Sequence, residues 1–290
     1  MRFAIATPVY NGMPHLPACI GSVRGQDTGI DRTHLVQDGG STDGSRDWLA
    51  RADGVAAVME KDAGMYDAIN RAWSRADADV YSWLNSDEQY LPGTLAAVRD
   101  AFTRNPDIDI VFGDAIIVDP SGNPLAARRE IPLRAWYVTN TFLYALSCTI
   151  FFRGRLRTAG DLAFDTTYRV AGDLELILRL LRRGARCLHL PRYLSLFGVD
   201  GRNLSLSEGM AREGEVIQRA FGAYRTKPLR RAVHALRCLE RAARGCYATD
   251  TVSYAFALDA TPTYRTFDRV PLGFRFTYDR ALRTLKGSTP

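Results

Sequence analysis

The feature that most constrains the fold is a regular alternation of short apolar runs with amphipathic stretches over the first 118 residues. Runs of strand length lie at 3–6, 35–37, 55–59, 80–84, 108–112 and 115–118. Between them the pattern predicts helices at 16–23, 65–75 and 92–103, and a further helix that Ser41 caps and that runs through Leu49. Such alternation indicates an α/β fold with a mostly parallel central sheet and helices on both faces.

Three loops that are acidic or rich in glycine follow predicted strands. They are DGG at 38–40, DAG at 62–64, and the adjacent pair Asp87 and Glu88. In parallel α/β sheets, ligands bind beyond the carboxyl ends of the strands, so we expect the three loops to converge on one crevice. Adjacent carboxylates repel one another, and a hard divalent cation that shares its oxygen ligands with a diphosphate would compensate them. A solvated acidic turn is the alternative interpretation.

The composition bounds the size of the fold and the kind of partner. The 290 residues suffice for one large domain or two small ones, and a formal charge of +6 favours anionic partners such as nucleotides or phospholipid head groups. A nucleic acid is not expected, because no stretch interleaves basic with aromatic residues. The five cysteines are widely spaced without a CxxC pair, which indicates a reducing cytoplasm. The uncharged stretch 135–152 contains hydroxyl and amide side chains, so we expect buried strand and loop there rather than a membrane helix.

The clearest element of the second half, besides a helix at 173–183, is a basic helix at 227–244. One side of it carries Leu229, Val233, Leu236 and Ala243, and another carries Arg230, Arg237, Arg241 and Arg244. In one interpretation the apolar side packs on the domain and leaves the arginines in water. In the other, the helix lies on an anionic membrane surface.

Five short motifs follow one another in an order that resembles family 2 glycosyltransferases. They read TPVYN at 7–11, QDGGSTDG at 37–44, EKDAGMYDAIN at 60–70, LNSDE at 84–88 and AGDLEL at 171–176. The resemblance implies a GT-A fold, which is a Rossmann-like α/β fold. It also implies a nucleotide-diphosphate sugar as donor, a divalent metal (Mn²⁺ or Mg²⁺), and transfer with inversion at the anomeric carbon. We therefore expect a GT-A domain at 1–222, with a nucleotide-sugar-binding half at 1–119 and an acceptor half at 120–222, followed by a mainly helical extension at 223–290.

The donor-binding roles that the resemblance implies fall on the first three motifs. Pro8 and Tyr10, together with Asp38, would hold the nucleobase, and Asp62 would lie near the base or the ribose. The carboxylate of Asp38 suits the N3–H of a uracil ring, so a UDP-sugar is the favoured donor, with dTDP-sugars and GDP-sugars left open. From the residues alone, Asp38 also fits an Asx turn closed by the two glycines that follow it.

The catalytic roles that the resemblance implies fall on the last two motifs. Asp87 would face the ribose or the metal, and Glu88 would be the metal ligand nearest the diphosphate. Asp173 would be the general base that deprotonates the acceptor hydroxyl, with Glu175 as the second candidate. An aspartate that opens a helix is also favoured by the helix dipole alone.

Some departures from the family pattern bear on function. Glu88 stands where the family usually has aspartate, and Ser147 and Cys148 stand where many relatives have His-Gln, in a region expected to form the acceptor wall. The loop at 198–205 is either a flexible lid over the donor or a solvated turn.

The expected acceptor is a glycan or a lipid-linked sugar, as in the synthesis of cell-surface polysaccharide. The expected location is the cytoplasm, with the inner face of the plasma membrane as a second expectation if the basic helix binds lipid. A non-catalytic nucleotide-sugar-binding protein is the alternative function. A nucleotidyltransferase is less favoured, because no glycine-rich phosphate loop with a basic residue lies near the N-terminus.

Overall fold

The computed structural model describes residues 1–199, 203, 207–256 and 263–271. Its main strands are β1 (Phe3–Val9), β2 (Arg32–Asp38), β3 (Ala56–Met59), β4 (Val80–Trp83), β5 (Glu88–Tyr90), β6 (Ile110–Val118), β7 (Pro124–Arg128), β8 (Ile150–Arg153) and β9 (Cys187–Gly198). Its helices are α1 (Leu16–Arg24), α2 (Ser45–Leu49), α3 (Met65–Ser74), α4 (Thr94–Arg104), α5 (Ala135–Asn140), α6 (Gly154–Thr158), α7 (Gly172–Arg182), α8 (Glu208–Ala220) and α9 (Lys227–Ala243), with a 3₁₀ turn η1 (Ser147–Thr149) before β8. Most of the loop expected to be a lid lies outside the described residues.

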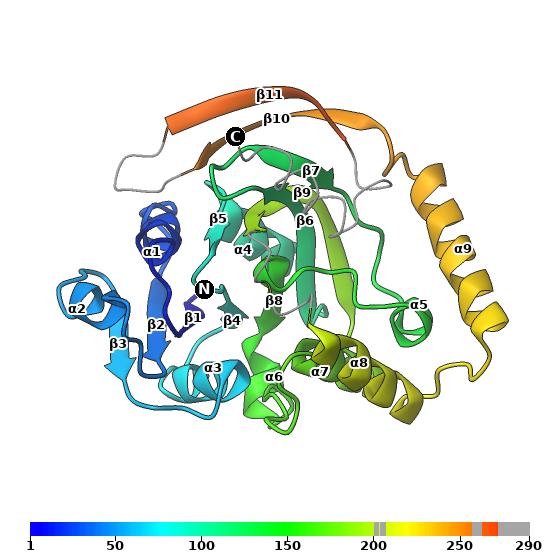
Figure 1. Cartoon of the computed structure of the whole chain (residues 1–290), viewed down its shortest axis with the longest axis horizontal. Helices are drawn as coiled ribbons and strands as arrows, with labels where there is room; N and C mark the ends of the chain where they lie inside the picture. Colours follow the sequence, from blue (N-terminus) through cyan, green and yellow to red (C-terminus); the bar gives the residue numbers. More distant parts are fainter. Residues whose placement is uncertain (200–202, 204–206, 257–262, 272–290) are drawn as a thin grey trace.

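The strands form one curled, nine-stranded sheet in the order β3-β2-β1-β4-β8-β6-β9-β5, with β7 paired to β6 (Figure 1). The pairings from β3 through β4 are all parallel, as the strand–helix alternation predicts. Beyond β4 the sheet is mixed, because β8 runs antiparallel to both of its neighbours and β5 runs antiparallel to β9. The alternation that favours parallel pairing therefore holds for the first half of the sheet only.

The strand β6 is continuous where the sequence predicted two strands. The predicted break fell at Gly113 and Asp114, which look like turn residues. In the structure Asp114 is buried, and its carboxylate accepts a hydrogen bond from the backbone N–H of Glu130 and contacts the imidazole of His189 at 2.8 Å. A buried polar side chain is tolerated inside a strand when it has such partners, and the register of β6 against β9 shifts at this point.

Both faces of the sheet are covered, and β1 shows how one strand serves both. Its alternate residues Ala4 and Ala6 belong to a core with α3 and α7, in which Trp73, Trp83 and Phe152 pack together. Phe3 and Ile5 point to the opposite face, into a core with α1 and α4. This alternation of side chains is the expected period of a strand that is buried on both sides.

The described part of the C-terminal extension, residues 223–256 and 263–271, is not mainly helical, whereas the prediction for 223–290 was a mainly helical extension. After α9 the described part of the chain forms an antiparallel hairpin of β10 (Thr249–Phe256) and β11 (Thr263–Pro271), which crosses the edge of the sheet near β7 (Figure 1). The hairpin buries Val252, Tyr254 and Val270 against β6 and β7. The alternation of Val252 and Tyr254 with polar residues was the period-two signal for this strand.

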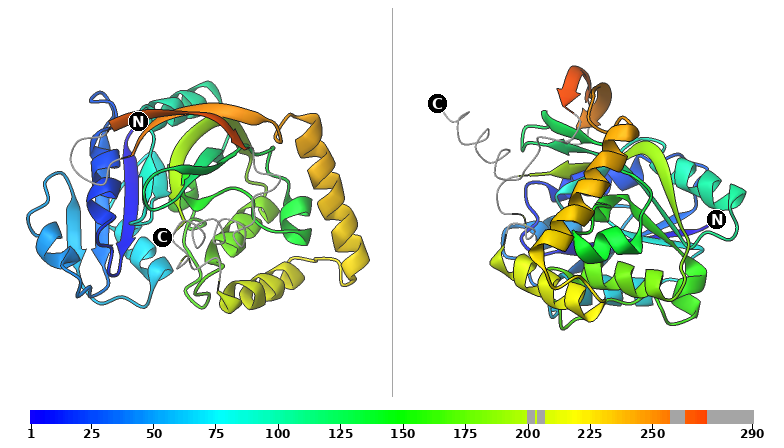
Figure 2. Two further views of the ribbon diagram at one scale, coloured as in Figure 1. Left: turned by 45° about the horizontal axis from the view of Figure 1, so that its top comes forward. Right: turned by 90° about the vertical axis from the view of Figure 1, so that its right-hand side faces the viewer.

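The helix α9 packs with its basic side inward, which is the reverse of the first interpretation given above. Val233, Arg237 and Arg241 are its buried residues. Leu229, Leu236 and Leu239 are exposed, although the first two were expected to face the domain. Figure 2 shows α9 lying along one side of the molecule, so that its outer face meets solvent.

The stretch 135–152 includes the short helix α5, the turn η1 and the start of β8, so the expectation of strand and loop missed one helix. In the described part of the chain, no helix combines the length and the apolar character that crossing a bilayer requires.

Candidate active site

A cavity of about 1430 Å³ opens at the carboxyl ends of β1 and β4 and extends to the inner face of α9. It exceeds the 300–1,000 Å³ that is usual for a small-molecule pocket, so it has room for two ligands. Of the residues proposed from sequence, it is lined by Pro8, Tyr10, Asp62, Asp87, Glu88 and Asp173. Asp38 is the one residue of that set that does not line it.

The loop after β1 is fixed by the loop after β2. The backbone N–H of Asn11 donates to the hydroxyl of Ser41 at 2.8 Å, and the side-chain carbonyl of Asn11 accepts from the backbone N–H of Thr42 at 2.9 Å. The backbone N–H groups of the next two residues donate to Ser45 and Asp43. The sequence suggested that Ser41 caps a helix, but it does not, because α2 begins only at Ser45. These contacts hold Tyr10, which is 72% exposed, at the mouth of the cavity.

Asp38 is fully buried at the end of β2 and closes a turn. Its Oδ1 accepts hydrogen bonds from the backbone N–H groups of Gly40 and Ser41, at 3.0 and 3.1 Å. This is the Asx-type arrangement that was the alternative to base binding. Its Oδ2 is buried and has no hydrogen-bond partner among the described residues.

Asp62 comes closer to the cavity than Asp38 does. A Cβ atom at Gly39 would lie 2.7 Å from the Oδ2 of Asp62, so glycine at position 39 lets this carboxylate lie directly against the backbone. Burial is the main cause that raises the pKa of Asp62, and its Oδ1 accepts from the backbone N–H of Gly64 at 2.9 Å. Lys61, which the motif analysis had not singled out, is an exposed cation on the same wall.

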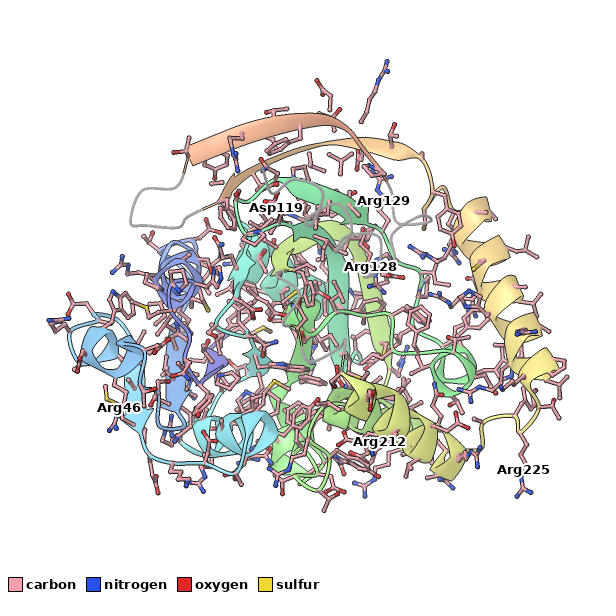
Figure 3. All side chains as sticks on the ribbon, viewed as in Figure 1. Arg46, Asp119, Arg128, Arg129, Arg212 and Arg225 are labelled. Carbon is pink, nitrogen blue, oxygen red and sulfur yellow. The ribbon has the colours of Figure 1, made fainter. Side chains whose placement is uncertain are left out.

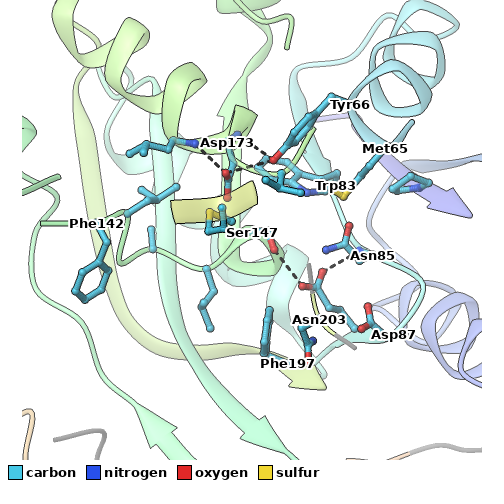
Figure 4. A pocket seen from close by; sticks show the side chains of 18 of the residues that line it. Met65, Tyr66, Trp83, Asn85, Asp87, Phe142, Ser147, Asp173, Phe197 and Asn203 are labelled. Atoms are coloured by element: carbon cyan, nitrogen blue, oxygen red, sulfur yellow. Dashed lines mark hydrogen bonds between the residues drawn. The ribbon is translucent and has the colours of Figure 1, made fainter. Parts of the chain in front are cut away.

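The adjacent carboxylates Asp87 and Glu88 have opposite surroundings. Asp87 is exposed at the cavity, whereas Glu88 is buried at the start of β5 (Figure 4). The two carboxylate oxygens of Glu88 accept hydrogen bonds from the backbone N–H of Asn85, at 2.8 Å, and from the hydroxyl of Ser147, at 3.0 Å. Burial, and then the charge of Asp87, raise the pKa of Glu88 to about 8. Glu88 is therefore mostly protonated at neutral pH when no cation is bound.

Of the two residues in the segment expected to form the acceptor wall, Ser147 lines the cavity and Cys148 does not. Ser147 lines the cavity beside the carboxylate pair, through its hydrogen bond to Glu88. Cys148 is fully buried, and burial raises the pKa of its thiol well above the ordinary range. Sequence reasoning missed the link to Glu88 because 59 residues separate the two partners.

Asp173 lies in the first turn of α7, on another wall of the cavity (Figure 4). Its Oδ1 accepts from the backbone N–H of Leu174 at 2.9 Å and from the hydroxyl of Tyr66 at 3.4 Å. Burial raises the pKa of Asp173 to about 6, so the group is mostly ionised at pH 7 and close to the range of an effective general base. Glu175, the second candidate, is paired with Arg179 at 2.8 Å and does not line the cavity.

Two residues that the sequence did not reveal position Asp173. Tyr66 comes from α3 and lies so close to Gly172 that a Cβ there would be 2.7 Å from its ring. Glu213 comes from α8, and its carboxylate accepts from the backbone N–H groups of residues 169, 170 and 171, each at 2.9 Å. Contacts from two distant helices thus fix the first turn of α7.

The residues at the carboxylate pair fit a hard divalent cation only together with a ligand. The described residues contain no group of three or more His, Cys, Asp and Glu side chains that could hold a metal by themselves. Mg²⁺ is commonly held by one or two carboxylates plus the phosphates of a substrate, and Asp87 with Glu88 matches that donor set. Asp87 supplies the accessible oxygens, and Glu88 supplies a second carboxyl group whose proton a cation would displace.

Comparisons with known proteins find relatives among the glycosyltransferases. Two uncharacterized glycosyltransferases are 26% identical over 125 residues (Rickettsia conorii) and 24% identical over 191 residues (Mycobacterium tuberculosis). These alignments cover 42% and 61% of this chain, and 21% and 67% of the respective relatives. A third, from a Nostoc species, is covered over 40% of its length. The chain thus spans less than half of two of these relatives.

Solved structures share the fold. S. aureus TarS 1–349 in complex with UDP-GlcNAc superimposes with a TM-score of 0.62 at 16% identity, over 84% of this chain and 73% of that one. The mannosyltransferase PcManGT from Pyrobaculum calidifontis, in complex with GDP-Man and Mn²⁺, gives a TM-score of 0.54 at 19% identity, over 83% and 75%. Both sequence identities are too low for a function to be transferred to this chain. The two structures therefore support the GT-A fold alone. Residues 4–159 match the model of glycosyl transferase family 2, which is more than half of the chain, so the protein belongs to that family.

Proposed function

We propose that the protein is an inverting glycosyltransferase that moves a sugar from a nucleotide-diphosphate donor to a hydroxyl group of an acceptor. The observation that carries this proposal is that one cavity is lined both by an exposed carboxylate, Asp87, and by a carboxylate suited to act as a base, Asp173. A single displacement needs a cation at the leaving diphosphate and a base at the attacking hydroxyl, and the two groups must act from opposite sides of the sugar.

The donor would lie across the ends of β1 to β4. Tyr10 and Pro8 offer surfaces for the nucleobase, and Asp62 lies against Gly39 within reach of the base or the ribose. Asp38 is too deeply buried to touch a nucleotide in this conformation, so its role in our proposal is to hold the loop that does. A UDP-sugar remains the favoured donor, because TarS is described with UDP-GlcNAc; PcManGT, described with GDP-Man, keeps a GDP-sugar open.

The metal, Mn²⁺ or Mg²⁺, would be held by Asp87 and Glu88 with the diphosphate, and it would supply positive charge to the leaving group. Asp173 takes the proton from the acceptor hydroxyl while that oxygen forms a bond to the anomeric carbon and the bond to the diphosphate breaks. Tyr66 and the N–H of Leu174 orient the carboxylate for this step.

A test should separate an enzyme from a protein that only binds nucleotide sugars. Thermal unfolding with UDP, GDP and dTDP, each with and without Mn²⁺, reports the donor site, since a ligand at about 100 times its Kd adds about 2.7 kcal/mol of stability. Release of nucleotide from the sugar donor in the presence of candidate acceptors reports transfer. Asp173→Asn should keep the nucleotide-induced stabilisation and lose transfer. Stabilisation without turnover in the wild type would favour the non-catalytic alternative, and unchanged turnover in Asp173→Asn would reject this base.

We further propose that the protein works on a glycan or lipid-linked acceptor at the cytoplasmic face of a membrane. The outer face of α9 carries Leu229, Leu236 and Leu239 in the open. Exposed basic residues flank them, namely Lys227, Arg231 and Arg244 on the helix and Arg225 just before it, which points away from the molecule in Figure 3. An apolar stripe between cations suits an anionic lipid surface.

Flotation with vesicles that contain phosphatidylglycerol tests this surface. The wild type should float with anionic vesicles and not with neutral ones, and replacing the three leucines with glutamate should abolish flotation. Val216→Glu on α8 is the matched control, because Val216 is also exposed but lies off this face. A wild type that stays at the bottom of the gradient with anionic vesicles would reject membrane association.

A further inference from the structure

A buried arginine that forms no ion pair within the described part of the chain lies on the wall of the cavity farthest from the donor motifs. Arg237 of α9 is only 2% exposed, and its Nε and Nη1 find no hydrogen-bond acceptor among the described residues. Its guanidinium lies over the ring of Phe142 at 4.3 Å and near that of Tyr144 at 5.2 Å. Cation–π contacts compensate part of the lost hydration, yet the N–H groups in the guanidinium plane still lack acceptors.

The surroundings of Arg237 carry an excess of positive charge. Arg128 pairs with Glu130 at 2.5 Å, and the Nε of Arg241 lies 3.8 Å from the same carboxylate. Among the described residues, the carboxylate of Glu130 thus lies near the guanidinium groups of Arg128, Arg237 and Arg241, and all three arginines line the cavity. Figure 3 shows Arg128 in the space between the central sheet and α9. Burial, the largest cause, and the charges of Arg241 and Arg128 lower the pKa of Arg237, whereas Glu130 raises it.

Two neighbouring arginines, Arg230 and Arg134, do not share this deficit, whereas the Nε of Arg241 also has no hydrogen-bond partner among the described residues. Arg230, about two turns earlier on α9, donates to Glu215 at 2.5 Å and to the backbone carbonyl of Asn140 at 3.2 Å. Arg134 donates to Glu240 at 2.8 Å. A buried cation is costly unless it is paired, so an unpaired one beside a cavity indicates a ligand that brings the missing negative charge.

The missing charge does not belong to the donor diphosphate. Phe142, on which Arg237 stacks, lies on the opposite side of Asp173 from Asp87 in the close view of the cavity (Figure 4). The donor phosphates would lie at Asp87, whereas the acceptor hydroxyl would lie at Asp173. An anion at Arg237 would therefore belong to the acceptor, beyond its reacting hydroxyl.

We propose that Arg237, with Arg241 and Arg128, binds an oxyanion carried by the acceptor, so that the acceptor is an anionic molecule with a phosphate or a carboxylate group. This inference rests on the proposed function, because it assigns one end of the same cavity. It requires that the guanidinium of Arg237 turn toward the cavity that it lines. The fork of N–H donors of arginine matches both oxyanions.

The test measures dissociation constants by calorimetry for glycerol 1-phosphate and for glucuronate, with and without saturating UDP and Mn²⁺. The wild type is compared with Arg237→Met, Arg237→Lys and Arg231→Met. Arg231 is the matched control, because it is an exposed arginine of the same helix. We expect Arg237→Met to bind at least one probe ten times more weakly than the wild type, Arg237→Lys to fall between them, and Arg231→Met to match the wild type. The probe that binds identifies the oxyanion.

The stability of Arg237→Met gives a second readout. Because its charge has no partner in the free protein, its removal should leave the melting temperature unchanged or raise it. Three results would overturn the proposal. Arg237→Met could fail to fold, it could bind both probes as tightly as the wild type does, or the wild type could bind neither probe. Nucleotide binding is measured separately on the wild type. If nucleotides bind but the anion site fails, only this inference falls, and if the anion binds but no nucleotide does, the proposed function falls instead.

Discussion

The buried carboxyl group of Glu88 gives the sharpest prediction, because it makes stability depend on pH in a known direction. Its pKa of about 8 in the folded protein lies above its ordinary value of 4.5. Below pH 4.5 the group is protonated in both the folded and the unfolded chain, so its ionisation does not lower the free energy of unfolding. Above that pH the unfolded chain releases the proton first, so the contribution of Glu88 becomes increasingly unfavourable until about pH 8. By pH 7 it should have removed about 3 kcal/mol of unfolding free energy.

Glu88→Gln removes this titration while keeping the shape of the side chain. The amide oxygen of glutamine can accept from the N–H of Asn85, and its NH₂ group can donate to the hydroxyl of Ser147, which turns to accept. Urea unfolding is measured at pH 5, 6, 7 and 8 without metal. The unfolding free energy of the variant, relative to that of the wild type, should increase by about 1 kcal/mol per pH unit. Comparing the two proteins cancels the titration of groups that they share, including Asp173.

Two further measurements make the comparison specific. Glu60→Gln, at a glutamate whose side chain is 66% exposed, should follow the wild type at every pH. Mn²⁺ with the nucleotide that binds should stabilise the wild type more at pH 8 than at pH 6, because the cation favours the ionised pair. Parallel stability curves for the wild type and Glu88→Gln would refute the assignment of a raised pKa to Glu88.

Three other predictions concern the proposed base, Asp173, and the residues that pack around it. Transfer should decline below pH 6, as Asp173 becomes protonated, and a rate that stays flat from pH 5 to 8 would argue against this base. Tyr66→Phe should move that decline to higher pH, since the hydroxyl favours the ionised carboxylate, and rates measured across pH will show the direction. Gly172→Ala should cost about 1–3 kcal/mol in urea unfolding, because its Cβ would lie 2.7 Å from the ring of Tyr66. Gly21→Ala is the control, because Gly21 is also helical and its Cβ would meet open space.

The sequence allowed the parallel half of the sheet and two loops at its carboxyl edge to be predicted, because both depend on local patterns. Strand–helix alternation placed the loops of Asp62 and Asp87 at one edge, and the structure has both at the cavity. The different surroundings of Asp87 and Glu88 could not be predicted. Successive residues at the start of a strand point to opposite sides, and adjacency alone does not say which one turns inward.

The partners of Asp173 could not be predicted either, since they depend on long-range packing. Tyr66 lies 107 residues away along the chain and meets Asp173 because Gly172 leaves room for its ring. Glu213 comes from α8, which packs beside α7. No local pattern around residue 173 contains either contact. A general base can thus be recognised by its motif, whereas its orientation is determined by helices that the motif does not include.

The helix α9 shows why periodicity identifies two faces of a helix but not which one is buried. Hydrophobicity alone places its leucines inside, yet Val233, Arg237 and Arg241 are the buried residues. The domain opposite α9 presents acceptors as well as apolar side chains. The acceptors are the carboxylates of Glu130 and Glu215 and the backbone carbonyls of residues 129 and 140. Burying arginines there is favourable where these acceptors reach them. Among the described residues they leave the Nε and Nη1 of Arg237 and the Nε of Arg241 without a hydrogen bond. Because the basic face of α9 is turned toward the cavity, its leucines on the opposite face are exposed to solvent.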